Sequence, residues 1–436
     1  MNHLLKIVDE QKRGIPAGVV SVCSANEIVI EAAMESAAGM GIPVLVEATA
    51  NQVNQFGGYT GMKPGDFKKF VLGIADAISF DKKKIILGGD HLGPLTWVGE
   101  DEESAMKKAE ELVYSYALEG FAKIHLDTSM RVASDSKTER LSDATIARRA
   151  ARLCRAAEDA FQKLKAKDPK AEKPLYVIGS EVPIPGGAQE EEDSVSVTTP
   201  GAFKETVRTF KEAFEKNGLS DAWSRVIAVV VQPGVEFGDA AVIRYDGAKA
   251  RDLCASLREY PGIVFEGHST DYQTPESLRE MVADGVAILK VGPALTFALR
   301  EGLFALCEIE NELVPAAKRS YLRETLMECM SEKPDNWKKH YRGSESEVRF
   351  KLKYSYSDRL RYYLTEPEVT AAISKLVDNL SREEIPDGIL SQWFPVQYPK
   401  VRLGELKKTP RELLKDRVKV RLEDYNGAFS VHTGKV

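Results

Sequence analysis

Residues 85–94 read IILGGDHLGP. A short apolar run ends in two glycines, and an acid and an imidazole, Asp90 and His91, follow at once before another glycine and a proline. Short apolar runs bounded by Gly and Pro are typical of strands that are buried on both faces of a parallel sheet. We therefore expect a strand over residues 85–90 that leaves two reactive side chains at its C-terminal end.

The same pattern recurs at seven other places, which are separated by helical patterns. We expect these further strands at residues 18–23 (GVVSVC), 43–47 (PVLVE), 122–127 (AKIHLD), 175–181 (LYVIGSE), 226–232 (VIAVVVQ), 263–268 (IVFEGH) and 287–291 (AILKV). Eight strands that alternate with helices predict an α/β fold of the (β/α)8 TIM-barrel type. A doubly wound open sheet is the alternative, and the absence of a GxGxxG opening argues against it.

The chain changes character beyond about residue 303. Residues 304–436 are charged, aromatic and helical in pattern, and they contain no further strand–helix units. We expect a barrel over residues 1–303, with the site at its strand ends, and a C-terminal helical extension over 304–436 that packs on the barrel. The extension includes the segment YSYSDRLRYY, with Arg359 and Arg361, and it could cover the barrel mouth.

Composition argues against several classes of function. The formal net charge is −6 over 436 residues, which gives no reason to expect nucleic acid or an acidic membrane as a partner. No apolar run is long enough to cross a bilayer, and the N-terminal stretch MNHLLKIVDEQKRG has no signal-peptide pattern. The five cysteines show neither metal-site nor disulfide spacing. We expect a cytoplasmic protein, and we also expect a homo-oligomer.

Polar residues stand at the C-terminal ends of the predicted strands, where barrel enzymes carry their chemistry. Side chains alternate between the two faces of a strand, so His125 and Asp127 share one face, and Glu266 and His268 likewise share a face. The barrel mouth is therefore expected to gather many acids and imidazoles. The polar strand ends are Glu47, Asp90, His91, His125, Asp127, Glu181, Gln232, Glu266, His268 and Lys290.

A divalent cation would explain this gathering. A buried acid or imidazole must be paired, coordinated or hydrogen-bonded, because leaving it alone costs several kcal/mol. Neutral imidazoles and carboxylates around an open position are the usual form of a catalytic metal site. The cation could polarise a ketose carbonyl while a neighbouring acid moves a proton. We expect His91 and His268 to be metal ligands.

Several of these residues have a second interpretation. His125 could orient Asp127 or the substrate instead of binding the metal. Glu47 and Glu266 could simply form hydrogen bonds inside the barrel. Lys290 could form a Schiff base, or it could neutralise those acids. The residues alone leave these alternatives open.

Two loop regions bear on the substrate. GGYTG at residues 57–61 lacks the GK[ST] ending of a phosphate-binding P-loop, and it is either a lid or a cluster of turns. HSTDYQ and VGPAL close the last two strands, where barrels often bind phosphate. Ser269, Thr270 and the backbone near Gly292 could do so, but no basic cluster stands beside them. A free sugar and a phosphorylated sugar therefore both stay open as substrates.

A set of long motifs resembles the Z-type subunit family of tagatose-bisphosphate aldolase over nearly the whole chain. The motifs are SVCSAN, VLVEATANQVNQFGGYTGM, ILGGDHLGP, KIHLDTSM, VIGSEVPIPGG, VVQPGVEF, EGHSTDYQT, ILKVGPALTFALRE, WKKHYRG and SDRLRYY. The resemblance implies a fold like that of class II fructose-bisphosphate aldolases. Family members were named as non-catalytic partners of a catalytic Y-type subunit, and they have also been called tagatose 6-phosphate kinases. Some stand-alone relatives are regarded as metal-dependent epimerases of fructose and tagatose.

The class II aldolase pattern transfers to this chain where residues match. Asp90 and His91 are similar to its Asp-His pair, an acid and a metal ligand, and His268 is similar to a later ligand. Glu181 stands where the pattern has an intermediate histidine ligand. The resemblance thus implies a metal set of His91, Glu181 and His268, which would suit Mn²⁺, Mg²⁺ or Ni²⁺ as well as Zn²⁺. The replacement of a histidine argues against ordinary aldolase activity.

Two hypotheses follow. The first is a metal-dependent ketohexose 4-epimerase acting on fructose or tagatose, with Asp90 and either Asp127 or Asp271 as its acid–base pair. The second is a non-catalytic subunit that stabilises a Y-type aldolase partner. We favour the enzyme, because a scaffold has no physical need to keep these polar strand ends. The substrate contacts expected for the enzyme are Glu47, Gln52, His125, Gln232, Glu266, Ser269 and Lys290.

Overall fold

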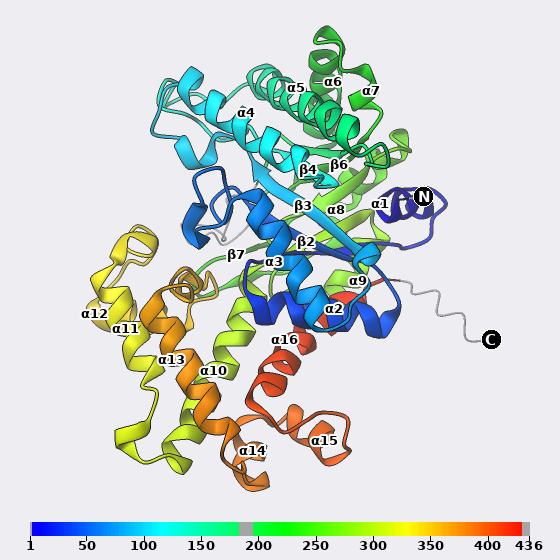
Figure 1. Ribbon diagram of the computed structural model, residues 1–436. Coiled ribbons are helices and arrows are strands. Elements are labelled where there is room, and N and C mark those ends of the chain that lie inside the picture. Colours follow the sequence, from blue (N-terminus) through cyan, green and yellow to red (C-terminus); the bar gives the residue numbers. More distant parts are fainter. Residues whose placement is uncertain (1, 183–194, 430–436) are drawn as a thin grey trace, which may run out of the picture.

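The computed structural model describes residues 2–182 and 195–429. Within these residues, eight parallel strands close into a barrel in the order β1-β10-β9-β6-β5-β4-β3-β2 (Figure 1). Every predicted strand is confirmed, with ends that differ by a few residues. The barrel strands are β1 (Val19–Cys23), β2 (Val44–Thr49), β3 (Ile85–Leu92), β4 (Lys123–Leu126), β5 (Leu175–Ile178), β6 (Val226–Val231), β9 (Val264–Gly267) and β10 (Val286–Val291).

The strands form where short runs of Val, Ile and Leu can be buried on both faces. Every residue of β1, β2 and β6 is buried, as expected when side chains point alternately into the barrel and toward the helices. The parallel register pairs Cys23 with Glu47, and Thr49 with Asp90. The polar strand ends therefore lie together at one rim of the barrel.

Helices surround the strands, and most of them begin at a polar cap. The side chains of Asn26, Asp101 and Ser142 accept hydrogen bonds from N–H groups in the first turns of α2, α4 and α5. A short two-stranded sheet follows β6, made of β7 (Glu236–Phe237) and β8 (Val242–Ile243). The helices of the ring are α2 (Glu27–Met40), α3 (Pro64–Ala77), α4 (Glu102–Leu118), α5 (Asp143–Lys167), α6 (Pro200–Lys216), α7 (Ser220–Trp223), α8 (Gly247–Ser256), α9 (Pro275–Ala283) and α10 (Pro293–Leu313).

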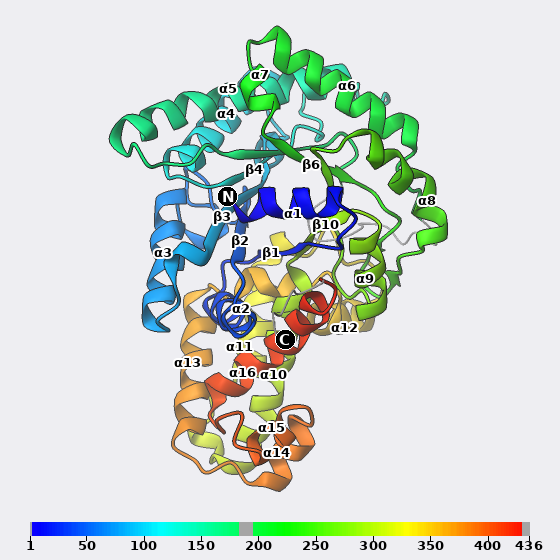
Figure 2. The ribbon, with the colours of Figure 1, turned by 90° about the vertical axis from the view of Figure 1, so that its right-hand side faces the viewer.

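Helix α1 (His3–Lys12) lies across the N-terminal end of the barrel, as Figure 2 shows. Leu4 and Ile7 of this helix pack in one apolar cluster with strand residues that include Val19 and Leu45. Because this end is filled with apolar side chains, the C-terminal end of the strands is the one left for a site.

The chain beyond the barrel folds into helices that lie to one side of it (Figures 1 and 2). The boundary expected at residue 303 falls inside α10, which also packs against α13 and α16. Ion pairs attach α16 to α2, since Arg411 lies 2.7 Å from Glu27 and Lys415 lies 2.9 Å from Glu31. Among the described helices, we find none that is long and apolar enough to span a bilayer. The helices of the extension are α11 (Leu322–Glu332), α12 (Glu345–Tyr354), α13 (Pro367–Ser381), α14 (Asp387–Trp393), α15 (Gln397–Arg402) and α16 (Pro410–Asn426).

Residues 355–363, which we call the mouth segment, bring the extension to the open end of the barrel. Tyr272 of the barrel donates a hydrogen bond to the carbonyl oxygen of Tyr356 at 2.6 Å. The ring of Tyr362 meets the ring of Tyr59 edge to face, with 4.8 Å between the centroids. The extension therefore helps to shape the barrel mouth.

Candidate metal centre

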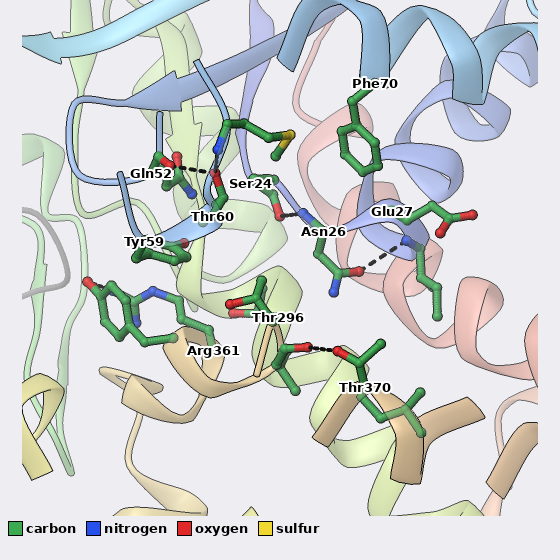
Figure 3. Close-up of a pocket in the computed structure, with 18 of the residues that line it drawn as sticks. Ser24, Asn26, Glu27, Gln52, Tyr59, Thr60, Phe70, Thr296, Arg361 and Thr370 are labelled. Atoms are coloured by element: carbon green, nitrogen blue, oxygen red, sulfur yellow. Dashed lines mark hydrogen bonds between the residues drawn. The ribbon is translucent and has the colours of Figure 1, made fainter. Parts of the chain in front are cut away.

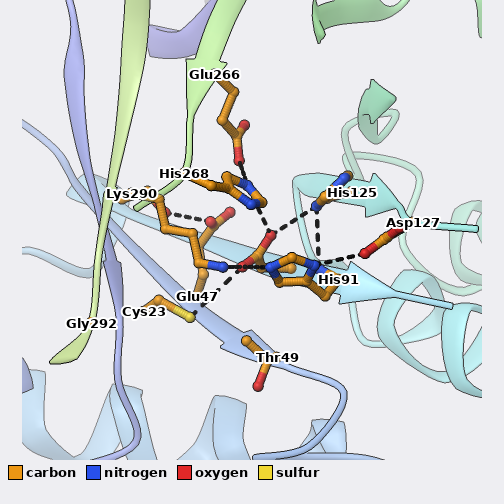
Figure 4. Close-up of polar contacts among 12 residues, drawn as sticks. Cys23, Glu47, Thr49, His91, His125, Asp127, Glu266, His268, Lys290 and Gly292 are labelled. Carbon is orange, nitrogen blue, oxygen red and sulfur yellow. Dashed lines mark hydrogen bonds and ion pairs between the residues drawn. The ribbon is translucent and has the colours of Figure 1, made fainter. Parts of the chain in front are cut away.

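Three imidazoles meet at the mouth of the barrel, as Figure 4 shows. His91 lies near the end of β3, His125 lies in β4 and His268 follows β9, and all three are buried. The ring centroids are 4.7 Å apart for His91 and His268, 5.2 Å for His125 and His268, and 5.4 Å for His91 and His125. The fold thus brings side chains that are distant in sequence into mutual contact.

Each of these rings keeps one buried nitrogen that has no hydrogen-bond partner among the described residues. The three atoms are Nε2 of His91, Nε2 of His125 and Nδ1 of His268. Buried polar atoms are nearly always satisfied in proteins, so three unsatisfied nitrogens in one cluster need an explanation. Neutral imidazole is the commonest protein ligand of metal ions, and a bound ion would satisfy such nitrogens.

The other nitrogen of each ring lies against a carboxylate. This arrangement fixes the orientation of an imidazole and makes it a better metal ligand. The pairs are His91 Nδ1 with Asp127 Oδ2 at 2.7 Å, His125 Nδ1 with Asp90 Oδ1 at 2.8 Å, and His268 Nε2 with Glu266 Oε1 at 3.1 Å.

Burial keeps two of the imidazoles in the form that binds metals. It lowers the pKa of His91, and it lowers the pKa of His268 to about 3, with the charge of Lys290 acting in the same direction. Both rings are therefore neutral at pH 7. Metal ions bind neutral imidazole and compete with protons for it.

Four residues can offer ligand atoms that all lie within 4.8 Å of one another: Asp90, His125, Glu266 and His268. Nε2 of His91 stands beside this group, 3.8 Å from Oδ2 of Asp90. Mixed imidazole and carboxylate donors suit Zn²⁺, Mn²⁺ or Ni²⁺ better than Mg²⁺, which prefers oxygen ligands. The residues present therefore fit a divalent metal ion, and their chemistry does not select one.

Two lysines pair with the carboxylates of the cluster. Nζ of Lys123 lies 2.9 Å from Glu47 and 2.9 Å from Glu266. Lys290 forms an ion pair with Asp90. We did not predict Lys123, although the alternation along residues 122–127 already places it on the same face of the strand as His125.

The cluster nevertheless keeps an excess of negative charge. Burial raises the pKa of Glu47, and burial alone would raise that of the other carboxylates. For Asp90 and Asp127, neighbouring imidazoles outweigh burial and hold the pKa below its usual range. For Glu266, Lys123 has the same effect and brings the pKa to about 2. The four buried carboxyl groups of Glu47, Asp90, Asp127 and Glu266 thus face two ammonium groups, and a divalent cation would offset the excess.

A cavity of about 600 Å³ adjoins this cluster (Figure 3). Cys23, Gln52 and Lys290 line it on the barrel side, and Arg361 lines it from the mouth segment. Sγ of Cys23 lies 3.9 Å from Asp90, and Lys290 pairs with the same carboxylate, so these two residues connect the cavity to the cluster. The volume is within the range of about 300–1,000 Å³ that is typical of small-molecule sites.

The structure does not bring Glu181 to the cluster. Its carboxylate accepts hydrogen bonds from Arg140 at 3.0 Å and from Thr198 at 2.6 Å. β5 ends at Ile178, so the alternation of a strand no longer directs Glu181 into the barrel. The geometry therefore places His125 and His268 among the candidate ligands, with His91 beside them, and it does not place Glu181 there.

Asp271 and Gln232 are engaged by backbone groups instead. Oδ1 of Asp271 accepts hydrogen bonds from the N–H groups of Gly292 at 3.1 Å and Ala294 at 2.7 Å, at the start of α10. The side-chain oxygen of Gln232 accepts two hydrogen bonds from the loop that follows it, at 2.9 and 3.0 Å. These contacts give both side chains a structural task at the barrel mouth.

Strained backbone accompanies the polar strand ends. His91 has a φ of 47°, Ser269 a φ of 55° and Tyr272 a φ of 64°, which places these residues in the left-handed region. This conformation costs free energy for residues other than glycine, and such residues are found in it mainly at functional sites. The ends of β3 and β9 are thus held in a costly geometry beside the candidate metal centre.

Residues 4–430 match the family described as D-tagatose-1,6-bisphosphate aldolase subunit GatZ/KbaZ-like. A solved structure described as a probable tagatose 6 phosphate kinase from Sinorhizobium meliloti 1021 is similar at 49% identity and a TM-score of 0.86, covering 94% of this chain and 100% of that one.

Two further solved structures are more distant. One is the fructuronate-tagaturonate epimerase UxaE from Cohnella laeviribosi, at 13% identity and a TM-score of 0.47, covering 94% of this chain and 81% of that one. The other is a fructose-bisphosphate aldolase from Campylobacter jejuni, at 15% identity and a TM-score of 0.44, covering 97% and 93%. The family match confirms the resemblance inferred from the motifs. The chain belongs to the GatZ/KbaZ-like family of D-tagatose-1,6-bisphosphate aldolase subunits.

Proposed function

We propose that this protein is a divalent-metal-dependent epimerase that inverts carbon 4 of a ketohexose and so interconverts the fructose and tagatose configurations. Three buried imidazoles, each with an unpartnered nitrogen, beside a cavity of small-molecule size are the observation that supports the proposal. A pure scaffold would lose nothing by replacing such buried polar groups with apolar side chains of similar volume.

The chemistry of a ketose favours bond cleavage over proton exchange at carbon 4. The carbonyl at carbon 2 acidifies hydrogens on its neighbours, carbons 1 and 3, and leaves the hydrogen on carbon 4 unactivated. The hydroxyl on carbon 4 stands β to that carbonyl. When this hydroxyl loses its proton, the bond between carbons 3 and 4 can break, and its electron pair passes into an enediolate.

The return step inverts the configuration. The aldehyde formed at carbon 4 turns its other face to the enediolate, the same carbon–carbon bond forms again, and the proton returns to the oxygen on carbon 4. Atoms and electrons balance, so no oxidant or co-substrate is needed. A divalent ion bound at the cluster would supply positive charge for the ketose oxygen as negative charge develops there.

Asp90 is the base that we assign to the hydroxyl proton. Its Oδ1 contacts His125, whereas its Oδ2 contacts Lys290 at the edge of the cavity, where a bound sugar could displace the ammonium group. Asp127 is engaged by His91, and Asp271 by backbone N–H groups. We therefore assign the last two carboxylates to positioning and assign proton transfer to Asp90.

Direct assay of the purified chain tests this function. Metal-stripped protein is incubated with D-fructose or D-fructose 6-phosphate after addition of Zn²⁺, Mn²⁺, Ni²⁺ or Mg²⁺, and the carbon-4 epimer is measured by chromatography. We expect the epimer with at least one of these ions. In deuterated water, cleavage and re-addition leave carbon 4 without deuterium, whereas proton exchange would label it.

Two variants make the assay specific. Asp90→Asn should abolish turnover, whereas His3→Ala, in the helix at the closed end of the barrel, should not change it. If folded, metal-loaded protein forms no epimer from either sugar with any of these ions, the proposal is wrong.

The family match favours a second candidate, a subunit that stabilises a catalytic Y-type aldolase partner. This candidate predicts a complex on co-expression with such a partner, and a higher unfolding temperature of that partner within it. Asp90→Asn should leave this stabilisation intact. Loss of epimerisation without loss of the complex would therefore separate the two activities.

A further inference from the structure

The cavity beside the metal centre is lined by three cationic side chains, and two of them are already neutralised. Lys290 pairs with Asp90, and Arg411 pairs with Glu27 at 2.7 Å and with a further carboxylate of α2. For the third, Arg361, we find no carboxylate of the described residues within ion-pair distance. Among the described residues, Arg361 is thus the cation of this cavity that has no carboxylate in direct ion-pair contact, and only the more distant charge of Asp358 acts on it.

Neutral groups hold the Arg361 side chain in place. Its Nη1 donates hydrogen bonds to the carbonyl oxygens of Ser357 and Asp358, the latter at 2.8 Å, and its Nη2 donates to the Tyr362 hydroxyl at 3.1 Å. The guanidinium also lies over the Tyr362 ring, 4.5 Å from the centroid. A guanidinium stays charged at any physiological pH, so these contacts orient a positive charge without neutralising it.

The nearby carboxylates are occupied by other donors. Asp271 accepts two backbone N–H groups, and Asp358 contacts Thr296 and Arg300. Residues 359–363, which include Arg361, pack against α10, and Gly292 and Pro293 at the start of that helix line the same cavity. The guanidinium therefore stands near the start of α10, on the extension side of the cavity.

A second arginine strengthens the positive field. The guanidinium of Arg359 lies 5.4 Å from the Tyr362 centroid, on the same ring that Arg361 covers. Nη2 of Arg359 contacts Nδ1 of His340 at 2.9 Å, and its buried Nε has no partner among the described residues. Arg361 lines the cavity, and the charge of Arg359 behind the Tyr362 ring adds to the positive field there. A phosphate monoester carries a charge of about −1.5 to −2 at pH 7, which such a field would attract.

We propose that Arg361 binds the phosphate group of a phosphorylated ketose whose reacting carbons lie toward Lys290 and Asp90. The substrate is then a sugar phosphate and the extension supplies its anion-binding residue. The planar fork of an arginine suits phosphate oxygens, and the cavity of about 600 Å³ accommodates more than a free hexose. The identity of the sugar rests on the function proposed above, while the binding of phosphate by Arg361 does not.

Calorimetric titration of the metal-loaded protein tests the inference without requiring turnover. The probes are D-fructose 6-phosphate, D-fructose, inorganic phosphate and D-galacturonate, a sugar with a carboxylate. We expect D-fructose 6-phosphate to bind at least about tenfold more tightly than D-fructose, because charge-assisted hydrogen bonds are roughly twice as strong as neutral ones. Inorganic phosphate should compete with the phosphorylated sugar, and D-galacturonate should bind no better than D-fructose.

Arg361→Gln should remove the preference for the phosphorylated sugar and leave the affinity for D-fructose unchanged. Arg361→Lys should retain part of the preference, because it keeps the charge and loses the fork. Arg402→Gln, at an arginine on α15 whose side chain contacts Tyr398, is the matched control and should change neither affinity. Thermal unfolding of each variant checks that it is folded.

Equal affinity of the native protein for both sugars would overturn the inference, as would tighter binding of D-galacturonate. An Arg361→Gln variant that loses both sugars equally would show that the residue only supports the mouth segment. Epimerisation of free D-fructose with no phosphate preference would refute the inference and leave the proposed function standing. Tighter binding of the phosphorylated sugar without epimerisation would support the inference and refute the proposed function.

Discussion

Nδ1 of His91 lies 2.7 Å from a carboxylate oxygen of Asp127, so the nitrogen that His91 presents to the cluster is Nε2, which has no partner. Both side chains are fully buried, and Asp127 is itself held by the N–H and hydroxyl groups of Ser129 at 3.0 and 2.6 Å. These contacts at Nδ1 fix the orientation of the His91 imidazole and leave Nε2 free for a ligand role. Such carboxylate–histidine pairs are a recurrent means of orienting metal ligands.

Asp127→Ala should therefore weaken metal binding, although Asp127 orients a ligand and is not a ligand itself. We expect a loss of about 10–100-fold in affinity, the usual effect of removing a carboxylate that orients a ligand. Competition with a chelator of known affinity measures it. Ser129→Ala, which removes one of the groups that hold Asp127, should have a much smaller effect. Unchanged metal affinity in Asp127→Ala would show that His91 is not a ligand.

Lys123→Met should destabilise the fold strongly. The change leaves Glu47 and Glu266 buried beside each other without a counterion, and breaking a buried ion pair in this way costs about 3–5 kcal/mol. Urea unfolding measures the free energy change. Lys211→Met, at an exposed lysine 4.0 Å from Glu215, should change it by less than about 1 kcal/mol. Similar stabilities of the two variants would contradict this account.

Gly93→Ala should disrupt the link between β3 and β4. A Cβ atom at this position would lie 1.6 Å from the backbone oxygen of Asp127, and that oxygen cannot move without shifting the strand. We expect a loss of about 3 kcal/mol or more in the free energy of unfolding, at the upper end for overpacking. Gly99→Ala, where a Cβ would meet nothing within 4 Å, should stay within about 0.5 kcal/mol of the native protein.

The metal-free protein should lose stability as the pH falls below about 6.5. Burial lowers the pKa of His268 from its ordinary value of about 6.5 to about 3. Between these values the unfolded chain binds a proton that the folded chain does not, so the free energy of unfolding decreases as the pH falls, by at most about 1.4 kcal/mol per pH unit for this group.

Replacing this histidine isolates its share of the pH dependence. His268→Gln should flatten the profile between pH 5 and 6.5, because it removes a group that takes up a proton on unfolding in this range while the other titrating groups stay the same. Denaturant unfolding of metal-stripped protein at several pH values gives both profiles. Parallel profiles for the native protein and His268→Gln would refute the prediction.

The fold was predictable because its signals are local. The barrel strands are short runs rich in Val, Ile and Leu, fully buried in β1, β2 and β6, and the helices that follow begin at polar caps such as Asn26 and Ser142. The residue at which each strand or helix ends was less predictable. β5 stops at Ile178, which takes Glu181 away from the face that alternation assigned to it.

The site was predictable in composition and less so in the roles of its members. The convergence of His91, His125 and His268 follows from closing the barrel, since strand ends meet at one rim. Lys123 was missed because a lysine inside a short strand resembles an edge residue until the barrel closes around it. The engagement of Asp271 by the start of α10 depends on loop geometry that periodicity does not encode.

Metal binding by the purified chain tests the central claim most directly. Metal-stripped protein is dialysed against Zn²⁺, Mn²⁺ or Ni²⁺, and bound metal is counted for the native protein, for His268→Ala and His125→Ala, and for His3→Ala as control. We predict one ion per chain for the native protein and the control, and a loss of bound ion in the two cluster variants. Folded native protein that binds none of these ions, or cluster variants that bind as well as the control, would contradict the account.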